Sequence, residues 1–331
     1  MPAKHHRTSY GQRRSVLRRS ALVPLSAVLA LVTGTGAWYA FGGDGPRSAD
    51  GAAAASLAGS LDLPWPAEGQ ASAEVEGIGS LGSKGEQVPV PIASITKVMT
   101  AYVILNGHPM SGDGPGEQVK ADQQAADESF STAESTAPVL AGHQYTQQQL
   151  LELMMLPSGN NVARLLARWD SGDQQRFTAK MNKAAAALGM NRTTYTGASG
   201  IETDTTSTAA DQLKLARAVM MNEAFRRIVA TPSVTAPGVG TQIQNSNKLL
   251  GQDGVIGLKT GSSTPAGGNL MWAATQEAAG AARLILGVVL HQQPDTTPAE
   301  GMAAAFRSSH TLITAIRAAL PQALADPHPK R

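Results

Sequence analysis

The stretch PIASITKVMTAYVIL (91–105) places a serine and a lysine three residues apart at the start of an apolar segment. Residues i and i+3 share a helix face, so the Ser94 hydroxyl and the Lys97 amine can meet if the segment is helical. A helix N-terminus disfavours a cation and apolar surroundings disfavour a charged amine, so both lower the pKa of Lys97. A neutral amine can take the proton of a nucleophilic serine. The alternative is a helix-capping serine beside a lysine that reaches solvent.

A second pair of polar residues stands in PSGNN (157–161), where a proline ends one helix and a glycine permits a tight turn. Ser158 and Asn160 are therefore expected on a loop between two helices. A second hydroxyl can relay a proton there, and an amide can hold a substrate carbonyl. Taken alone, the motif is equally well explained if either residue caps the following helix.

The third motif is GLKTGSS (257–263), in which Lys259 lies between two glycines on the same face of a strand. Because glycine has no side chain, another backbone can approach these positions closely. An extended peptide can therefore pair along this strand, with its carboxylate near Lys259, Thr260 and Ser262. The alternative is an exposed edge strand that a lysine protects from aggregation.

Hydrophobic periodicity and turn residues place these motifs on particular elements. The sequence predicts one or two strands within 71–85, helices at 94–106, 146–156, 161–169 and 173–189 and one from about 207, strands at 254–261, 267–275 and 283–291, and a terminal helix at 298–320. The segment 107–145 is polar and rich in Gly and Ser, and it is expected to be a long irregular region with short strands. This order predicts an α+β fold, with an antiparallel sheet covered by the terminal helices and an inserted helical lobe. The helix at 94–106 is apolar nearly all round and should be central.

Together the motifs resemble those of the penicillin-recognising serine peptidases, with S-x-x-K as SITK, S-x-N as SGN and K-T-G as KTG. The flanking text LMMLPSGNNVA, STAADQLKLA and GVIGLKTGSSTPAGGNL resembles the low-molecular-mass D-alanyl-D-alanine carboxypeptidases, the penicillin-binding-protein-5-like group. The resemblance covers about residues 65–320. It implies the β-lactamase/penicillin-binding transpeptidase-like fold, with an antiparallel sheet flanked by helices and an inserted all-helical lobe.

The resemblance also implies an activity, the removal of the terminal D-alanine from peptidoglycan stem pentapeptides through an acyl-enzyme on Ser94. Lys97 would accept the serine proton, and Ser158 would help to return it. Backbone N–H groups of Ser94 and Ser262 would form the oxyanion hole, and β-lactams would acylate Ser94. The resemblance implies substrate contacts from five residues: Asn160, Lys259, Thr260, Gly261 and Ser262. It calls for no metal or organic cofactor.

Three other functions share these motifs. A class A β-lactamase needs an additional glutamate, and no E-x-x-x-N text follows the S-x-N motif in the helical region. The motifs do not distinguish a D,D-endopeptidase or transpeptidase from a carboxypeptidase, because they do not show whether water or an amine accepts the acyl group. A catalytically silent penicillin-binding scaffold is disfavoured, because every motif residue is present.

Composition narrows the remaining classes of function. The chain of 331 residues has no cysteine, which excludes disulfides, thiolate metal sites and a cysteine nucleophile. Its histidines are scattered, without a metal-binding spacing. Six Lys and Arg residues lie within 1–20, and acidic residues outnumber basic ones in the rest. This mildly acidic body opposes nucleic-acid binding.

The N-terminal region points to a membrane. Residues 21–41 carry no charge and match the ~20 residues that a transmembrane helix needs. They directly follow the basic segment 1–20. We expect a cytoplasmic tail, a single uncut membrane anchor and an extracytoplasmic catalytic domain, with a cleaved signal peptide and secretion as the alternative. The predicted organisation continues with a linker at 42–64, the catalytic domain at 65–320 and a tail at 321–331.

Overall fold

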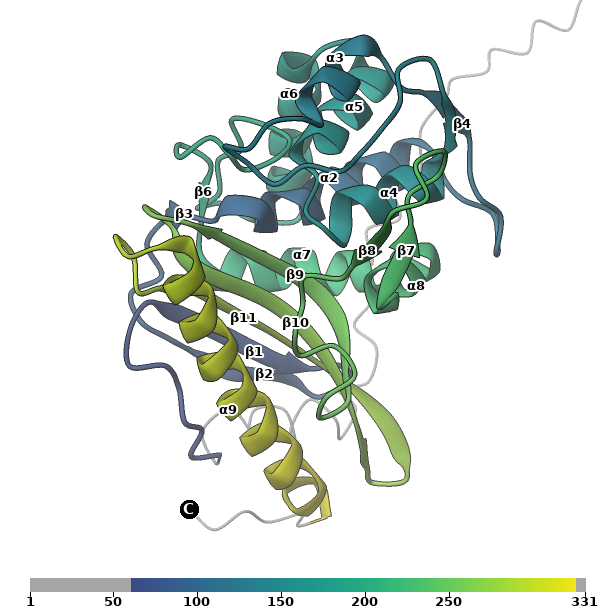
Figure 1. Ribbon diagram of the computed structural model, residues 1–331. Coiled ribbons are helices and arrows are strands. Elements are labelled where there is room, and N and C mark those ends of the chain that lie inside the picture. The colour runs from purple at the N-terminus through teal and green to yellow at the C-terminus, as the bar shows by residue number, and fades with distance from the viewer. Residues whose placement is uncertain (1–60, 326–331) are drawn as a thin grey trace, which may run out of the picture. The chain divides into compact units, whose positions relative to one another are not determined.

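The computed structural model describes residues 61–325 (Figure 1). The predicted basic tail 1–20, the predicted membrane segment 21–41 and most of the predicted linker lie outside the described residues. Within 61–325, no helix combines the length and apolar character that crossing a bilayer requires. The last residues of the predicted linker already belong to the folded unit, since Leu63 is buried.

A five-stranded antiparallel sheet brings the two ends of the described chain together, in the order β2-β1-β11-β10-β9. Its strands are β1 (Gln70–Val75), β2 (Gly79–Lys84), β9 (Val255–Ser263), β10 (Gly267–Ala278) and β11 (Ala281–Gln292). The three predicted C-terminal strands therefore form consecutive hairpins, as expected from their short connections. The predicted N-terminal strands join them because β1 pairs with β11. The strand with the K-T-G motif, β9, lies at the edge of the sheet.

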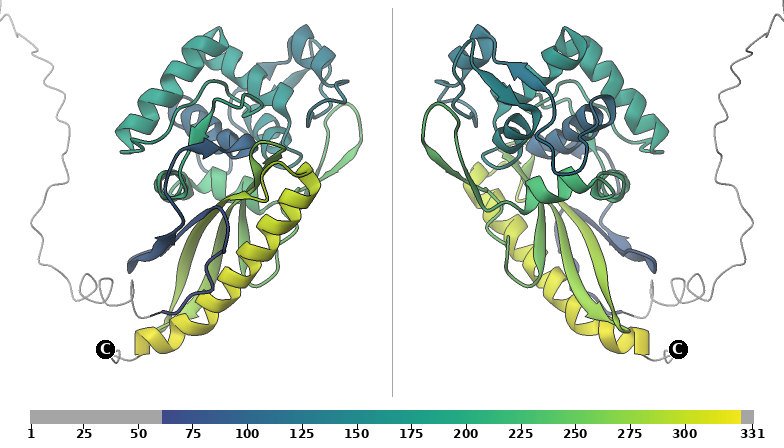
Figure 2. Two further views of the ribbon diagram at one scale, coloured as in Figure 1. Left: turned by 90° about the vertical axis from the view of Figure 1, so that its left-hand side faces the viewer. Right: turned by 90° about the vertical axis from the view of Figure 1, so that its right-hand side faces the viewer.

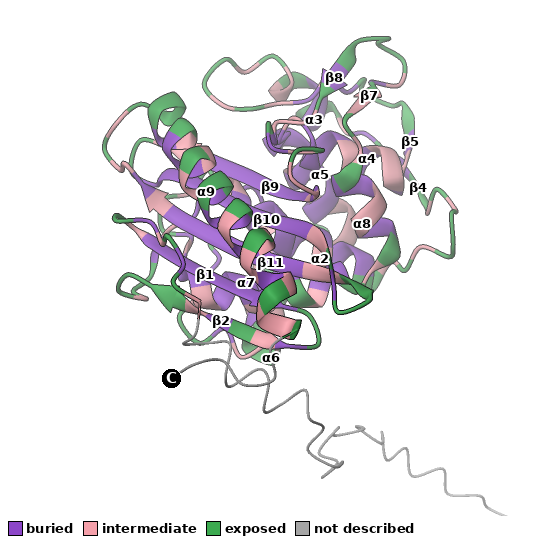
Figure 3. Ribbon diagram, turned by 90° about the horizontal axis from the view of Figure 1, so that it is seen from below, coloured by how far each residue is buried: buried purple, intermediate pink, exposed green. Residues whose placement is uncertain are grey.

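Both faces of this sheet are buried, and β10 shows how. Leu270 and Trp272 pack on one side, and Met271 and Ala273 pack on the other, because successive side chains alternate. The helix α9 (Pro298–Ala325) covers the first side (Figures 1 and 3). It runs five residues past the predicted end at 320 and includes Pro321, so the first part of the predicted tail is helical.

The segment between β2 and β9 forms a mainly helical lobe. Its helices are η1 (Ala93–Ile95), α2 (Thr96–Gly107), α3 (Gln123–Glu128), α4 (Gln147–Met155), α5 (Asn160–Ser171), α6 (Gln174–Ala187), α7 (Ala209–Met220) and α8 (Glu223–Ala230). Thr146 caps α4 in a capping box with Gln149, and Asp173 caps α6, both where the sequence predicted a helix start. The short helix α3 lies in the segment expected to be irregular.

The lobe is not all-helical, because it also contains three short strand pairs. These are β3 (Val90–Pro91) with β6 (Thr206–Ser207), β4 (Gln118–Lys120) with β5 (Gln144–Thr146), and β7 (Ser233–Thr235) with β8 (Gln242–Gln244). Short strands were expected within 107–145, where β4 lies and β5 begins. The strands of the other two pairs were not expected, because two or three residues are too few to show an alternating pattern.

The helix α2 is central, as its apolar character predicted. It packs against α4, α5, α6 and α7, and α7 in turn lies against β1 and β11 on the face opposite α9 (Figure 2). Its residues Val98, Met99 and Ile104 are fully buried. The beginning of α2 is therefore held rigidly between the lobe and the sheet.

Candidate active site

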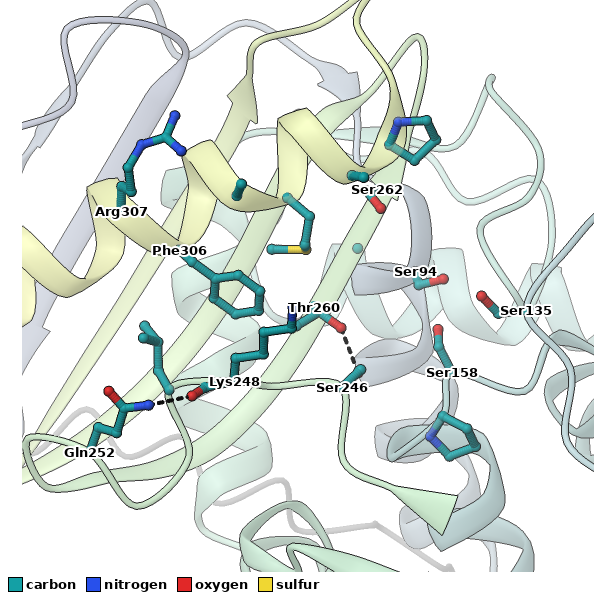
Figure 4. A pocket seen from close by; sticks show the side chains of 17 residues that line it. Ser94, Ser135, Ser158, Ser246, Lys248, Gln252, Thr260, Ser262, Phe306 and Arg307 are labelled. Atoms are coloured by element: carbon teal, nitrogen blue, oxygen red, sulfur yellow. Dashed lines mark hydrogen bonds between the residues drawn. The ribbon is translucent and has the colours of Figure 1, made fainter. Parts of the chain in front are cut away.

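Ser94 lies in η1, the short 3-10 turn that leads into α2. No side chain caps either helix, so the Ser94 hydroxyl is not used as a cap and the capping alternative is wrong. The preceding residue, Ala93, has a φ of 46°, in the left-handed region that non-glycine residues rarely adopt. Such strain is common at functional sites. Ser94 is partly exposed and faces a cleft (Figure 4).

Lys97 is fully buried, so the alternative of a lysine that reaches solvent is also wrong. Its Nζ lies 2.9 Å from Ser94 Oγ, 2.5 Å from Asn160 Oδ1 and 2.7 Å from the backbone oxygen of Ser199. Burial lowers the pKa of Lys97 well below its ordinary value, and the positive charge of Lys259 lowers it further.

These three contacts suit a neutral amine. Two of the neighbours of Lys97 are carbonyl oxygens, which can only accept, and a neutral amine has two N–H groups to give them. Its lone pair then remains for the third neighbour, the hydroxyl of Ser94. In this arrangement the proton of Ser94 points at a base that is 2.9 Å away, which is the geometry that activates a serine nucleophile.

Asn160 is the first residue of α5, and both ends of its amide are engaged. Oδ1 accepts from Lys97, and Nδ2 donates to Glu134 Oε2 at 2.7 Å. The side chain is buried and lies behind the cleft wall. The structure thus places it where it orients Lys97, and its contact with a substrate amide stays a prediction.

Glu134 had no motif to mark it, since it belongs to the loop after α3. Arg164 donates to both of its oxygens, at 2.6 and 3.0 Å. Burial raises the pKa of Glu134, but the hydrogen bonds from Arg164 and Asn160 outweigh it and hold that pKa below the usual value. A carboxylate held in this way is a poor base, so it does not supply the extra glutamate of a class A β-lactamase.

Ser158 does not cap α5, because the cap position is Gly159 and has no side-chain bond. Its φ of 69° is again in the left-handed region. Its Oγ is buried and has no hydrogen-bond partner within the described residues. Figure 4 shows Ser158 facing the same cleft as Ser94 and Ser135. An unpartnered hydroxyl here is free to take part in proton transfer.

The strand β9 forms the opposite wall. Lys259 is buried, which rules out an exposed lysine that guards the edge, and burial lowers its pKa to about 7. Its Nζ donates to the Thr260 backbone oxygen at 3.0 Å. The Thr260 hydroxyl bonds to Ser246 Oγ at 2.7 Å. A Cβ on Gly261 would lie 3.0 Å from the Ser94 nitrogen, so glycine allows η1 to lie against this strand.

The cleft between these walls has a volume of about 620 Å³. Five of the eight predicted site residues line it: Ser94, Ser158, Thr260, Gly261 and Ser262. The other three, Lys97, Asn160 and Lys259, lie buried beside it. Within residues 61–325, no group of His, Cys, Asp or Glu side chains has the arrangement of a metal site.

Sequence reasoning missed several residues that complete the site. Ser199 supplies only a backbone oxygen, which no side-chain pattern can reveal. The next residue is a glycine, Gly200, and this glycine is the weak sign in the sequence of a close approach. The structure shows why: a Cβ on Gly200 would lie 2.0 Å from the Ala93 oxygen. Ser135 and Ser246 line the cleft from irregular loops, and one face of α9 lines it as well.

Comparison with known proteins gives a consistent result. Residues 79–293 match the peptidase S11 family model, described as D-alanyl-D-alanine carboxypeptidase. The chain is 34% identical over 213 residues to the D-alanyl-D-alanine carboxypeptidase of Streptomyces sp. strain K15, covering 60% of this chain and 71% of that relative. It is 33% identical over 239 residues to D-alanyl-D-alanine carboxypeptidase DacB2 of Mycobacterium tuberculosis, covering 70% and 78%.

A solved structure is similar as well. The crystal structure of the Streptomyces K15 DD-transpeptidase matches with a TM-score of 0.64 at 29% identity, covering 77% of this chain and all of that one. The fold predicted from the motifs is therefore confirmed. The relative from Streptomyces strain K15 is named a carboxypeptidase, and the solved structure from Streptomyces K15 is named a transpeptidase.

Proposed function

This chain belongs to the D-alanyl-D-alanine carboxypeptidase family, peptidase S11, and from that premise we propose that it removes the terminal D-alanine from peptidoglycan stem pentapeptides through an acyl-enzyme on Ser94. The observation that carries the assignment to Ser94 is its contact with Lys97. The buried amine lies 2.9 Å from the hydroxyl and has its pKa lowered, so it can act as the base.

In the first step, Ser94 Oγ forms a bond to the carbonyl carbon of the penultimate D-alanine while its proton passes to Lys97. The tetrahedral intermediate carries an oxyanion, which we assign to the backbone N–H groups of Ser94 and Ser262 at the narrow junction of η1 and β9. The C–N bond then breaks. The leaving nitrogen receives a proton by way of Ser158, whose Oγ has no other partner among the described residues.

In the second step, water adds to the acyl carbon and the bond to Ser94 breaks, which restores the hydroxyl. Lys97 and Ser158 take the proton that the attacking water gives up and pass it to Ser94 Oγ, because the first proton has left with the amine of D-alanine. The terminal carboxylate of the peptide is bound by Lys259, Thr260 and Ser262 on β9. A protonated Lys259 is needed for that contact, and a carboxylate beside it favours the protonated form.

The test is direct. The chain is incubated with a D-Ala-D-Ala pentapeptide and separately with penicillin, and the acylated residue is located by mass spectrometry. We expect D-alanine release and a penicilloyl adduct on Ser94, both lost in Ser94→Ala. An unmodified Ser94 without D-alanine release would overturn the proposal.

Transfer to an amine remains the second candidate, because a similar solved structure is named a DD-transpeptidase. The acyl-enzyme on Ser94 is common to both reactions, and only the acceptor differs. Addition of an amino acid acceptor to the pentapeptide assay separates them. A carboxypeptidase releases D-alanine in equal amounts to shortened peptide, and a transpeptidase forms the acceptor-linked product.

We also propose that the chain is attached to the cytoplasmic membrane through residues 21–41, with the catalytic domain outside. The uncharged stretch and its basic flank support this proposal. Fractionation of cells that express the full chain, followed by N-terminal sequencing, tests it. A mature chain that begins after residue 37 and is found in the medium would indicate a cleaved signal instead.

A further inference from the structure

Three serine hydroxyls share the part of the cleft where the proposed reaction takes place. Ser94, Ser135 and Ser158 all line it, and Figure 4 shows their oxygens pointing toward one common space. Ser158 is buried, Ser94 is partly exposed and Ser135 is exposed, so the three form a series from the interior to solvent. The proposed reaction uses Ser94 and Ser158, and it leaves Ser135 without a role.

The backbone holds Ser135 beside the turn that carries Ser158. The Asn160 N–H donates to the backbone oxygen of Ser135 at 2.9 Å. A Cβ on Gly159 would lie 3.0 Å from Ala137 Cβ, so this glycine lets the two segments lie against each other. Ser135 and Ser158 therefore belong to two backbone segments in direct contact.

The residues next to Ser135 hold it in place with their side chains. Glu134 accepts two hydrogen bonds from Arg164, at 2.6 and 3.0 Å. The Thr136 hydroxyl donates to the Ser129 backbone oxygen at 3.1 Å. The hydroxyl of Ser135 itself makes no hydrogen bond to another residue of the part of the chain that the structure describes. A well-anchored loop thus presents an uncommitted hydroxyl to the cleft.

The second step of the proposed reaction, on which this inference rests, needs a water molecule in a particular place. The water attacks the acyl carbon from the side that the leaving nitrogen occupied, because hydrolysis runs the first step in reverse with water in place of the amine. Ser158 lies on that side, since it delivers the proton to the leaving nitrogen. A water held by one hydroxyl alone can turn about that bond, and a second contact fixes the lone pair that attacks.

We propose that Ser135 is a further catalytic residue, which binds the hydrolytic water of the second step. Its Oγ accepts a hydrogen bond from one O–H of the water, and Ser158 Oγ accepts the other. The water oxygen then faces the acyl carbon on Ser94. The position of Ser135 suits this role, because its exposed hydroxyl meets water that enters the cleft from solvent.

The step balances without any further reactant. The water oxygen forms a bond to the acyl carbon, and the proton on the Ser158 side passes through Ser158 and Lys97 to Ser94 Oγ as the ester bond breaks. The second proton of the water stays on the new carboxyl group of the shortened peptide, which then ionises in solvent. Ser135 neither gains nor loses a proton, so it orients the water and does not act as a base.

A substrate that separates the two steps tests this role. A thioester of the stem peptide acylates Ser94 rapidly, so the burst of released thiol measures acylation and the steady rate measures hydrolysis of the acyl-enzyme. We expect Ser135→Ala to slow the steady rate about tenfold, as the loss of one hydrogen bond does, and to leave the burst rate within about twofold of wild type. The acyl-enzyme should then accumulate on Ser94, where mass spectrometry of the intact protein detects it.

Two variants control for a change in the shape of the loop. Ser135→Thr keeps a hydroxyl and should hydrolyse the acyl-enzyme within about threefold of the wild-type rate. Ser131→Ala alters the same loop at a position outside the cleft lining and should leave both rates unchanged.

The outcomes separate this role from the proposed function. Hydrolysis of the acyl-enzyme at the wild-type rate in Ser135→Ala would overturn the role. Equal losses in the burst and the steady rate would also overturn it, because Ser135 would then act on the acyl peptide and not on water. A wild-type chain that shows no burst and no acylated Ser94 would instead overturn the proposed function.

Discussion

The two walls of the cleft are built in different ways. On the lobe side, Lys97 has three partners and Asn160 has two, so the amine behind Ser94 and the amide that holds it are already bonded. On the sheet side, Lys259 bonds chiefly to the backbone oxygen of its neighbour Thr260, and Ser262 is partly exposed.

This difference indicates which groups of the site already have their reactive geometry before substrate binds. The lobe wall holds the nucleophile and its base in a fixed geometry, which avoids reorganisation during the reaction. The sheet wall instead has an edge strand and a buried amine with few partners, and in the proposed function a peptide carboxylate supplies the partner of that amine. The predictions below probe each wall in turn.

The largest effect is expected on the lobe wall. Lys97→Met keeps the length of the side chain but removes the base, so acylation of Ser94 should slow by about 10³-fold. The rate of labelling by a fluorescent penicillin measures it. Lys183→Met on the surface of α6 is the control and should label at the wild-type rate. A labelling rate of Lys97→Met within tenfold of the wild-type rate would show that Lys97 is not the base.

The next effect concerns stability and the sheet wall. In the unfolded chain Lys259 has its ordinary pKa, whereas burial lowers that pKa to about 7 in the folded protein. The unfolded state therefore binds more protons above pH 7, and the free energy of unfolding rises with pH. Relative to Lys259→Met, the wild type should gain somewhat more than ~2 kcal/mol between pH 7 and pH 9, since Lys259 is already half titrated at pH 7. Urea unfolding at both pH values measures this. A free-energy difference between wild type and Lys259→Met that is the same at pH 7 and pH 9 would contradict the prediction.

Lys259→Met should also weaken substrate binding, by a smaller amount. A charged hydrogen bond to the peptide carboxylate is worth about 2 kcal/mol, so kcat/KM for the pentapeptide should fall about 30-fold. An ester substrate whose leaving group lacks a carboxylate is the comparison and should lose much less. Equal losses on both substrates would show that Lys259 does not act through the carboxylate.

The smallest effect distinguishes Glu134 from its neighbour Glu128, since both bind Arg164 but only Glu134 reaches Asn160. The charge of Glu134 raises the pKa of Lys97, against the stronger lowering by burial. Glu134→Gln should therefore shift the acid limb of the kcat/KM profile toward lower pH. Glu128→Gln should leave the limb in place. A shift toward higher pH in Glu134→Gln would contradict this assignment.

The sequence was sufficient for much of the fold, because the relevant signals are local. Thr146 and Asp173 mark helix starts through bonds to residues three positions ahead. The short links of the C-terminal strands predicted their hairpins. The short pairs β3–β6 and β7–β8 were missed, since strands of two or three residues show no period. The end of α9 was placed too early, because a proline usually interrupts a helix.

For the site, the sequence by itself determined the three motifs and therefore the proposed nucleophile, its proposed base and the strand opposite. Only the tertiary structure decided what surrounds them. The partners of Lys97 stand 63 and 102 residues away in the chain, and Ser199 contributes a backbone oxygen. The choice between a buried base and a lysine in solvent depends on burial. Burial results from the packing of distant segments, and no spacing within a motif encodes it.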